Sequence, residues 1–141
     1  MISMRFCLLS ATAIMAMSVG CTNSLESLPD GQQSQSTLSP DGITRAFVWV
    51  PKMSGGLGAT VSQSHQVWIE NTRMAGKRLM VEADKTEGLK LTWISVSTLE
   101  VCYADAQIFR FLNKFDFANE QSPEIISVEI VLRRMKTLDM C

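Results

Sequence analysis

The sequence predicts a mainly β fold, namely a small antiparallel sandwich or open barrel of six to seven strands. Apolar and polar residues alternate in several short runs, which is the spacing of strands that bury one face. Clusters of Gly, Pro, Ser and Asp separate these runs and indicate turns. The chain beyond residue 40 has about 100 residues, a length that supports one compact core.

The first expected strand covers residues 43–50, which are rich in aromatic and β-branched side chains. It follows the turn sequence Ser-Pro-Asp-Gly of residues 39–42 and stops at Pro51. Residues 59–70 are expected to pair with it across a glycine-rich connection. Residues 78–83 then form a further short strand.

Trp49 and Trp68 lie in stretches that are apolar on both faces of the expected strand. Val48 and Val50 oppose Trp49, and Val67 opposes Trp68. Either both faces of this sheet are covered, or one face carries an exposed aromatic patch. The pattern favours burial of both tryptophans in the core.

The later strands show the alternation more clearly. Residues 89–94 and 98–103 are separated by three residues and read as a hairpin, and residues 126–134 alternate throughout. Residues 106–115 are compatible with a strand or with one to three helical turns, and aromatic content favours a strand in the first half. Residues 116–124 are expected to form a polar loop.

Residues 1–20 have the pattern of a signal peptide. A positive region around Arg5 precedes Phe6–Val19, which carries no charge. This stretch is shorter than the about 20 residues needed to span a bilayer, but it suits a signal peptide. Residues 18–21, Ser-Val-Gly-Cys, resemble the bacterial lipobox, in which the cysteine is acylated and becomes the new amino terminus. Ser18 stands where that family most often has Leu, and an ordinary secretory signal is the alternative.

The resemblance implies that acyl chains on Cys21 anchor the protein to the membrane, without a transmembrane segment. Thr22 follows the cysteine in place of Asp, which by resemblance to lipoprotein sorting implies the outer membrane, facing the periplasm. Residues 21–40 are mostly small and polar, so a flexible linker is expected there, followed by the domain at 41–141. A short ordered extension lying on the domain is the alternative.

Two cysteines remain for the folded part, Cys102 and Cys141, in an exported and oxidising compartment. A disulfide between them would close a loop of about 40 residues and stabilise the domain by roughly 3–4 kcal/mol. Two separate thiols are the alternative. No Cys or His has the spacing of metal ligands, so no metal site is predicted.

Several motifs in residues 38–103 resemble a family of small bacterial proteins of unknown function. The shared pattern is a Ser-Pro-Asp-Gly turn, a Gly-Ala-Thr triplet at 58–60, a Gln-Val strand at 66–67, and a later Trp before a Leu-containing strand. That family often has a cysteine before the triplet, where this chain has Gly-Gly-Leu at 55–57. The resemblance implies a β fold and brings no activity with it.

The sequence offers little for catalysis, so no enzyme activity, catalytic residue, cofactor or small-molecule substrate is predicted. His65 is the single histidine, and on a strand it faces away from Ser62 and Ser64. No G-x-S-x-G motif occurs, and the glycine-rich stretch at 54–58 lacks the Gly-Lys-Ser/Thr ending of a phosphate-binding loop.

The net charge of the chain argues against nucleic acid as a partner. Removing Arg5 with the signal leaves 12 basic against 14 acidic side chains, a net charge of about −2, so nucleic acid is a poor partner. The sequence therefore predicts a lipid-anchored envelope protein that binds or supports an envelope protein partner. The alternative is an inhibitor or immunity-type lipoprotein acting against an incoming enzyme such as a lysozyme.

Overall fold

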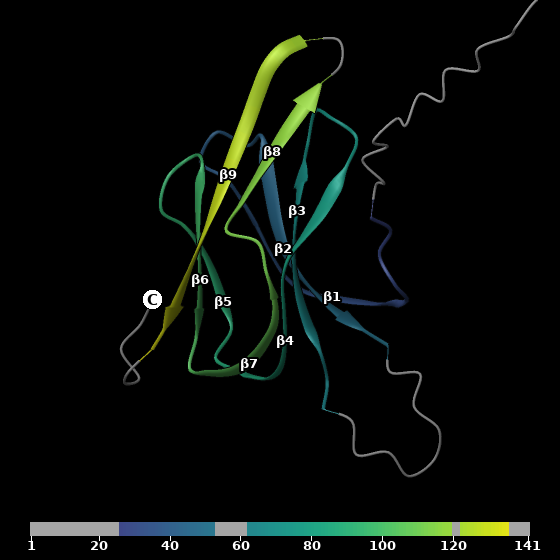
Figure 1. Cartoon of the computed structure of the whole chain (residues 1–141), viewed down its shortest axis with the longest axis vertical. Coiled ribbons are helices and arrows are strands. Elements are labelled where there is room, and N and C mark those ends of the chain that lie inside the picture. The colour runs from purple at the N-terminus through teal and green to yellow at the C-terminus, as the bar shows by residue number, and fades with distance from the viewer. Residues whose placement is uncertain (1–25, 53–61, 120–121, 136–141) are drawn as a thin grey trace, which may run out of the picture.

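Two β-sheets form the body of the protein (Figure 1). The computed structural model describes residues 26–52, 62–119 and 122–135, and these form strands and no helix. The strands are β1 (Gly31–Leu38), β2 (Thr44–Pro51), β3 (His65–Asn71), β4 (Lys77–Glu87), β5 (Lys90–Trp93), β6 (Thr98–Tyr103), β7 (Asp105–Phe111), β8 (Lys114–Asn119) and β9 (Ser122–Arg134). The predicted mainly β class is confirmed, with nine strands in place of six to seven.

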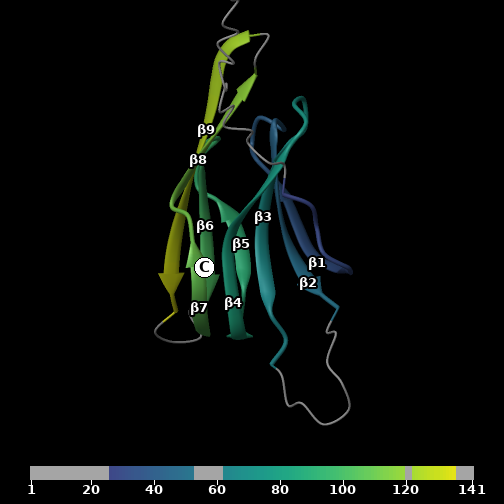
Figure 2. The same cartoon turned by 45° about the vertical axis from the view of Figure 1, so that its right-hand side comes forward.

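The sheets have the strand orders β1-β2-β3-β4-β7 and β5-β6-β9-β8 and lie face to face (Figure 2). All neighbouring strands are antiparallel except β6 and β9, which are parallel. The chain changes sheet after β4, after β6 and after β7. The sheets are therefore not wholly antiparallel, because β7 pairs with β4 in the first sheet and β9 returns parallel to β6 in the second.

The core fills the space between the sheets and follows the predicted alternation. Val67 and Ile69 of β3 meet Leu99 and Val101 of β6 and Val128 of β9 in one buried cluster. The partly buried side chains of Trp93 on β5 and of Ile126 and Leu132 on β9 pack against this cluster, as the alternation in the sequence indicated. The pattern in the sequence therefore identified the inner face of these strands correctly.

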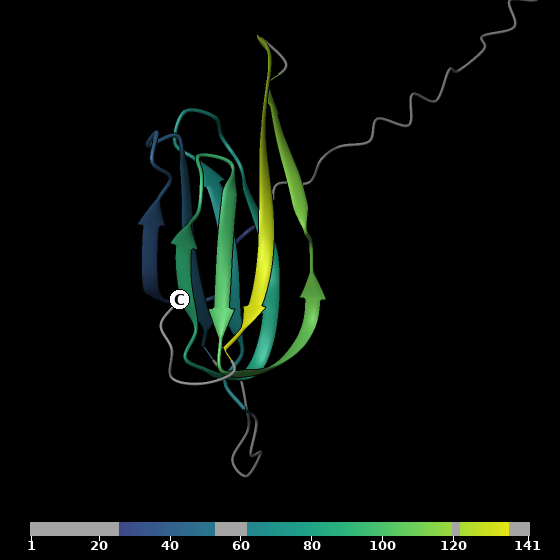
Figure 3. The ribbon, with the colours of Figure 1, turned by 90° about the vertical axis from the view of Figure 1, so that its left-hand side faces the viewer.

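Hydrogen bonds join the two sheets at both long sides. At one side, the Leu91 N–H of β5 donates to Gln35 Oε1 of β1 at 3.0 Å. At the other, the turn between β7 and β8 bridges the sheets, since Leu112 N–H donates to the Met80 carbonyl and the Asn113 carbonyl accepts from Ile130 N–H. The sandwich is thus partly closed towards a barrel, as Figure 3 shows from the side of the second sheet.

The Ser-Pro-Asp-Gly sequence forms the turn between β1 and β2. Ser39 Oγ donates to Asp41 Oδ1 at 2.5 Å and accepts from Thr44 N–H at 2.9 Å. Asp41 Oδ1 also accepts from Ile43 N–H at 3.0 Å, and Gly42 has a φ of 70°, which favours glycine. The bond from Ser39, followed by that from Ile43, lowers the pKa of Asp41.

Part of the expected linker belongs to the domain. Residues 31–38 form β1, paired with β2 along its length, so the flexible linker at 21–40 and the domain boundary at 41 were wrong in this part. β1 is an edge strand with mostly exposed side chains, and backbone hydrogen bonds hold it. Its polar composition therefore resembles that of a linker, and the alternative of an ordered extension describes residues 26–38 better.

The chain after β6 contains two strands where one strand and a loop were expected. β7 confirms the strand in the first half of residues 106–115. β8 begins at Lys114 and runs into the expected polar loop, which was wrong for residues 116–119 and 122–124. Phe115 and Phe117 of β8 pack edge to face with ring centroids 5.0 Å apart, so neighbouring aromatic residues stabilise this strand.

Candidate functional site

A short segment before β1, residues 26–30, crosses the outer face of the first sheet, and we name it the N-terminal strap. Leu28 packs against Phe47, Trp68 and Leu79, which are 1, 2 and 5% exposed. Trp49 Nε1 donates to the Pro29 carbonyl at 3.0 Å. The strap therefore explains why the strands around both tryptophans are apolar on both faces. The predicted burial is confirmed for Trp68, whereas Trp49 is only partly buried.

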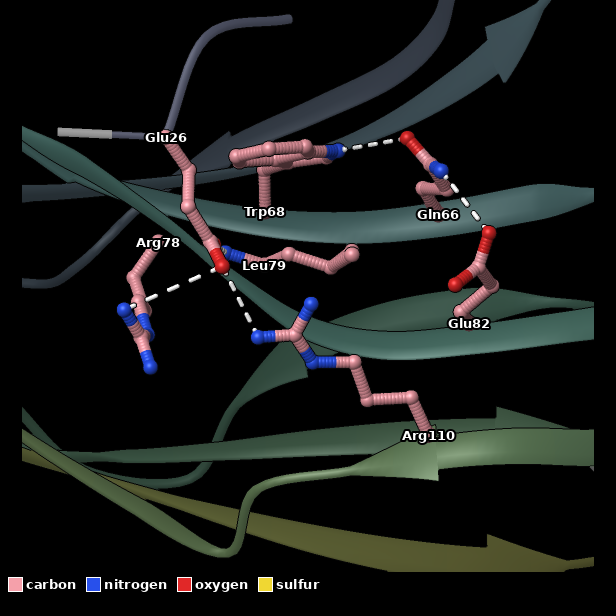
Figure 4. A network of polar contacts seen from close by, with 7 residues as sticks. All are labelled: Glu26, Gln66, Trp68, Arg78, Leu79, Glu82 and Arg110. Atoms are coloured by element: carbon pink, nitrogen blue, oxygen red, sulfur yellow. Dashed lines mark hydrogen bonds and ion pairs between the residues drawn. The ribbon is translucent and has the colours of Figure 1, made fainter. Parts of the chain in front are cut away.

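Glu26 fixes the beginning of the N-terminal strap to β4 and β7 (Figure 4). Its Oε2 accepts from the Leu79 N–H at 3.0 Å, and its Oε1 accepts from Arg110 Nη2 at 2.8 Å. Arg78 Nη1 lies 3.8 Å from the same Oε1. One carboxylate thus faces two guanidinium groups and one backbone N–H.

These contacts also decide the ionisation of Glu26. Partial burial raises the pKa of its carboxyl, but the hydrogen bond from Leu79 N–H, that from Arg110 and the charge of Arg78 outweigh burial. The net result is a pKa below the ordinary value of 4.5. The Glu26 carboxylate is therefore ionised at neutral pH and holds the strap through ion pairs and hydrogen bonds.

A second polar network lies beside the strap on the same face (Figure 4). Trp68 Nε1 donates to Gln66 Oε1 at 3.1 Å, and Gln66 Nε2 donates to Glu82 Oε1 at 2.9 Å. Gln66 is 8% exposed, so these bonds satisfy an amide that would otherwise be buried without partners. The network orients Trp68 under the strap.

The predicted lipidation residue, Cys21, lies outside the described residues, and so does Cys141. Cys102 is on β6 and fully buried, with its sulfur 3.3 Å from Glu100 Oε1. Met135 N–H donates to the Tyr103 carbonyl at 2.8 Å, which brings the end of the described chain beside Cys102. The Cys102–Cys141 disulfide stays a prediction, and five residues lie between Met135 and Cys141.

His65 begins β3 and is half-buried. Its Nδ1 and the Ser64 Oγ are shielded from solvent, and neither has a hydrogen-bond partner among the residues described. Within residues 26–52, 62–119 and 122–135, no group of three or more His, Cys, Asp or Glu side chains gathers as metal ligands do. Among the described residues, His65 Nδ1 therefore has no hydrogen bond to a serine hydroxyl.

A depression of about 380 Å³ lies where β1 begins and β2 ends, at the end of this strand pair away from its turn. Its described lining is Gly31, Gln32, Val50, Pro51, Lys52 and Gln63. A Cβ on Gly31 would lie 2.4 Å from the Val50 carbonyl oxygen and 2.6 Å from Trp49 Nε1, so only glycine lets the strap enter β1 here. This described lining brings one cation and two amides together.

Several large apolar side chains remain exposed on the described surface. They are Leu38, Ile94, Val96, Phe109, Phe111, Ile125 and Val131. Phe109 and Phe111 lie on β7, the edge strand beside the Glu26 contacts, whereas Ile125 lies on the β8–β9 hairpin, which extends beyond the other strands (Figures 1 and 2). No helix among the residues the structure describes is long and apolar enough to cross a membrane.

The strap contacts were not predicted from the sequence. Glu26 falls in a polar stretch, and Arg78 and Arg110 lie in two different expected strands. The one available signal was the apolar character of both faces around Trp49 and Trp68, which required a cover from elsewhere in the chain.

Comparisons with known proteins add no relative. No protein-family model matches the chain, and neither the curated proteins nor the solved structures compared with it gave a match.

Proposed function

We propose that the protein is a lipid-anchored protein of the bacterial envelope, held at the outer membrane through Cys21 and facing the periplasm, with a binding or supporting role and no catalytic one. The observation that carries the proposal is the Ser-Val-Gly-Cys sequence at the end of an uncharged stretch of 14 residues. A cysteine at that edge is the substrate of lipoprotein processing, and acyl chains would then supply the anchor.

The first described residues lie close in sequence to the proposed anchor and are fixed on the sandwich. The described fold starts at Glu26, five residues after Cys21, and its first residues are fastened to β4 and β7. A lipid on Cys21 would therefore attach directly to a folded sandwich. The proposed anchor would keep the domain in the envelope, so we propose an envelope protein as its partner. The net negative charge disfavours nucleic acid.

Metabolic labelling with an alkyne analogue of palmitate tests the anchor. We expect label on the wild-type chain in the outer-membrane fraction and loss of label in Cys21→Ser, which should accumulate as unprocessed precursor or leave the membrane. Thr22→Ser, next to the same site, serves as the matched control and should keep its label. Equal labelling of wild type and Cys21→Ser would contradict the proposal.

The β8–β9 hairpin favours a second candidate, an inhibitor of an incoming enzyme such as a lysozyme. The hairpin extends from the body (Figure 3), Ile125 is 65% exposed, and Ser127 Oγ donates to Asp116 Oδ1 across its arms at 2.5 Å. A projecting hairpin with an apolar side chain can enter a partner's cleft. Capture from envelope extract with wild type and Ile125→Ser separates the two: one enzyme lost with the substitution supports the inhibitor, and retention of resident envelope proteins by both supports the first proposal.

A further inference from the structure

We infer that the β4–β7 side of the first sheet contacts the lipid bilayer, and we name it the bilayer-facing surface, formed by Phe109, Phe111, Arg78 and Arg110. The inference rests on the proposed acylation of Cys21 and adds to it the orientation of the domain. The occupant of this surface is the headgroup region of the membrane that holds the anchor.

The length of chain between anchor and fold limits where the domain can lie. Five residue steps separate Cys21 from Glu26, and a fully extended chain covers at most about 3.6 Å per residue, so their Cα atoms are at most about 18 Å apart. The expected 20-residue linker would have allowed about 70 Å. Glu26 is fixed on β4 and β7, so this side of the sandwich must stay near the bilayer.

The apolar part of the surface suits an interface. Phe109 is 59% exposed and Phe111 is 41% exposed. Both lie on β7, the edge strand of the first sheet that also carries Arg110, a partner of Glu26. Phe109 is the residue without a partner where the pairing of β4 and β7 shifts between Glu82–Arg110 and Ala83–Ile108. Aromatic side chains on a polar background bury readily at the headgroup and acyl boundary.

The polar part of the surface supplies hydrogen-bond donors for phosphate. The side chains of Arg78 and Arg110 are 32 and 37% exposed, and the one carboxylate that contacts both belongs to Glu26. Glu82 is the partner of Arg110 in the pairing of β4 and β7, so two guanidinium groups and two carboxylates lie close together here. Arginine binds phosphate oxygens through two parallel hydrogen bonds, which matches a phospholipid headgroup.

The opposite side of the molecule offers a control. Ile94 is 59% exposed, the same fraction as Phe109, but it follows β5, at the edge of the other sheet away from β8 and the β7–β8 turn. The two residues match in exposure and apolar character and differ in their distance from Glu26. Contact with lipid at Phe109 and not at Ile94 would therefore report orientation.

Photo-crosslinking of the full acylated protein in phospholipid vesicles tests the inference. With benzoylphenylalanine at position 109 we expect phospholipid adducts by mass spectrometry, several-fold more than with the same group at position 94. Equal adducts at both positions, or protein–protein crosslinks in place of lipid at position 109, would overturn the inference. A protein found without acyl groups refutes the proposed anchor, whereas an acylated protein without lipid adducts at 109 refutes the orientation alone.

A longer tether tests the length argument separately. Inserting about 15 Gly and Ser residues after residue 25 leaves the acylation site and the described fold intact but lets the sandwich leave the bilayer. We expect the lipid adducts at position 109 to fall several-fold while palmitate labelling is unchanged. Unchanged adducts after this insertion would show that proximity to the anchor is not what places the surface.

Discussion

The Glu26 carboxylate makes the polar contacts that hold the N-terminal strap on β4 and β7, so replacing this residue tests how the strap is held. Glu26→Ala removes the acceptor of the Leu79 N–H at 3.0 Å and of Arg110 at 2.8 Å. Glu26→Gln removes the charge and keeps one of the two acceptor oxygens, because its amide NH2 group replaces the other oxygen. Comparing the two substitutions therefore separates the loss of both acceptors from the loss of the charge and one acceptor.

The expected magnitudes follow from these contacts. A hydrogen bond to a charged group contributes about 1.5–3 kcal/mol, and a largely exposed ion pair contributes about 0.2–1 kcal/mol. The Glu26 side chain is 23% exposed, so its bond to the backbone keeps most of its value while solvent weakens the arginine pairs. We expect Glu26→Ala to lower the free energy of unfolding by about 2–3 kcal/mol and Glu26→Gln by about 1 kcal/mol.

The effect should depend on pH with a defined sign. The folded pKa of Glu26 lies below the ordinary value of 4.5, so the charged form stabilises the fold above that pH and the contribution is lost as pH falls below it. Urea unfolding followed by circular dichroism at pH 7 and at pH 3 measures this for the domain without its signal. The deficit of Glu26→Gln should be present at pH 7 and shrink at pH 3.

Glu129→Gln is the matched control, since it makes the same charge change at an exposed position of β9. It should change stability by less than about 0.5 kcal/mol at either pH. A Glu26→Gln deficit that is equal at pH 7 and pH 3, or no larger than that of Glu129→Gln, would refute the role of the Glu26 charge.

Three further perturbations test other contacts, each by thermal unfolding. Gly31→Ala should lower stability by about 1–3 kcal/mol, because its Cβ would lie 2.4 Å from the Val50 carbonyl oxygen, and an unchanged midpoint would contradict this close approach. Leu28→Ala should cost about 1–2 kcal/mol and shift tryptophan emission to the red as the strap loosens, so unchanged emission would count against the cover. Reduction of the Cys102–Cys141 pair should lower stability by roughly 3–4 kcal/mol, and Cys141→Ser should remove any response to reductant; two titratable thiols in the untreated protein would exclude the bond.

The sequence predicted those parts of the fold in which local pattern and burial agree. Alternation placed Leu99, Val101 and Val128 in the core, and the turn at residues 39–42 precedes the strand β2 as expected. In these elements each side chain reports the environment of its own strand.

The parts that were missed depend on contacts between distant segments. β1 carries few apolar side chains and is held by backbone bonds to β2, which leave no trace in side-chain composition. Glu26 acts through Arg110, 84 positions later in the chain, and no spacing rule joins them. The parallel pairing of β6 with β9 likewise follows from the sheet change at β7, which no single run of residues encodes.

The central claim is that Cys21 is the acylated amino terminus of the mature protein. Intact-mass measurement on protein purified from membranes tests it most directly, with fragmentation of the first residues to place any modification. We expect a chain that begins at Cys21 and carries diacylglyceryl or triacyl mass on that residue. A mature chain that begins at another residue, or that begins at Cys21 without lipid, would contradict it.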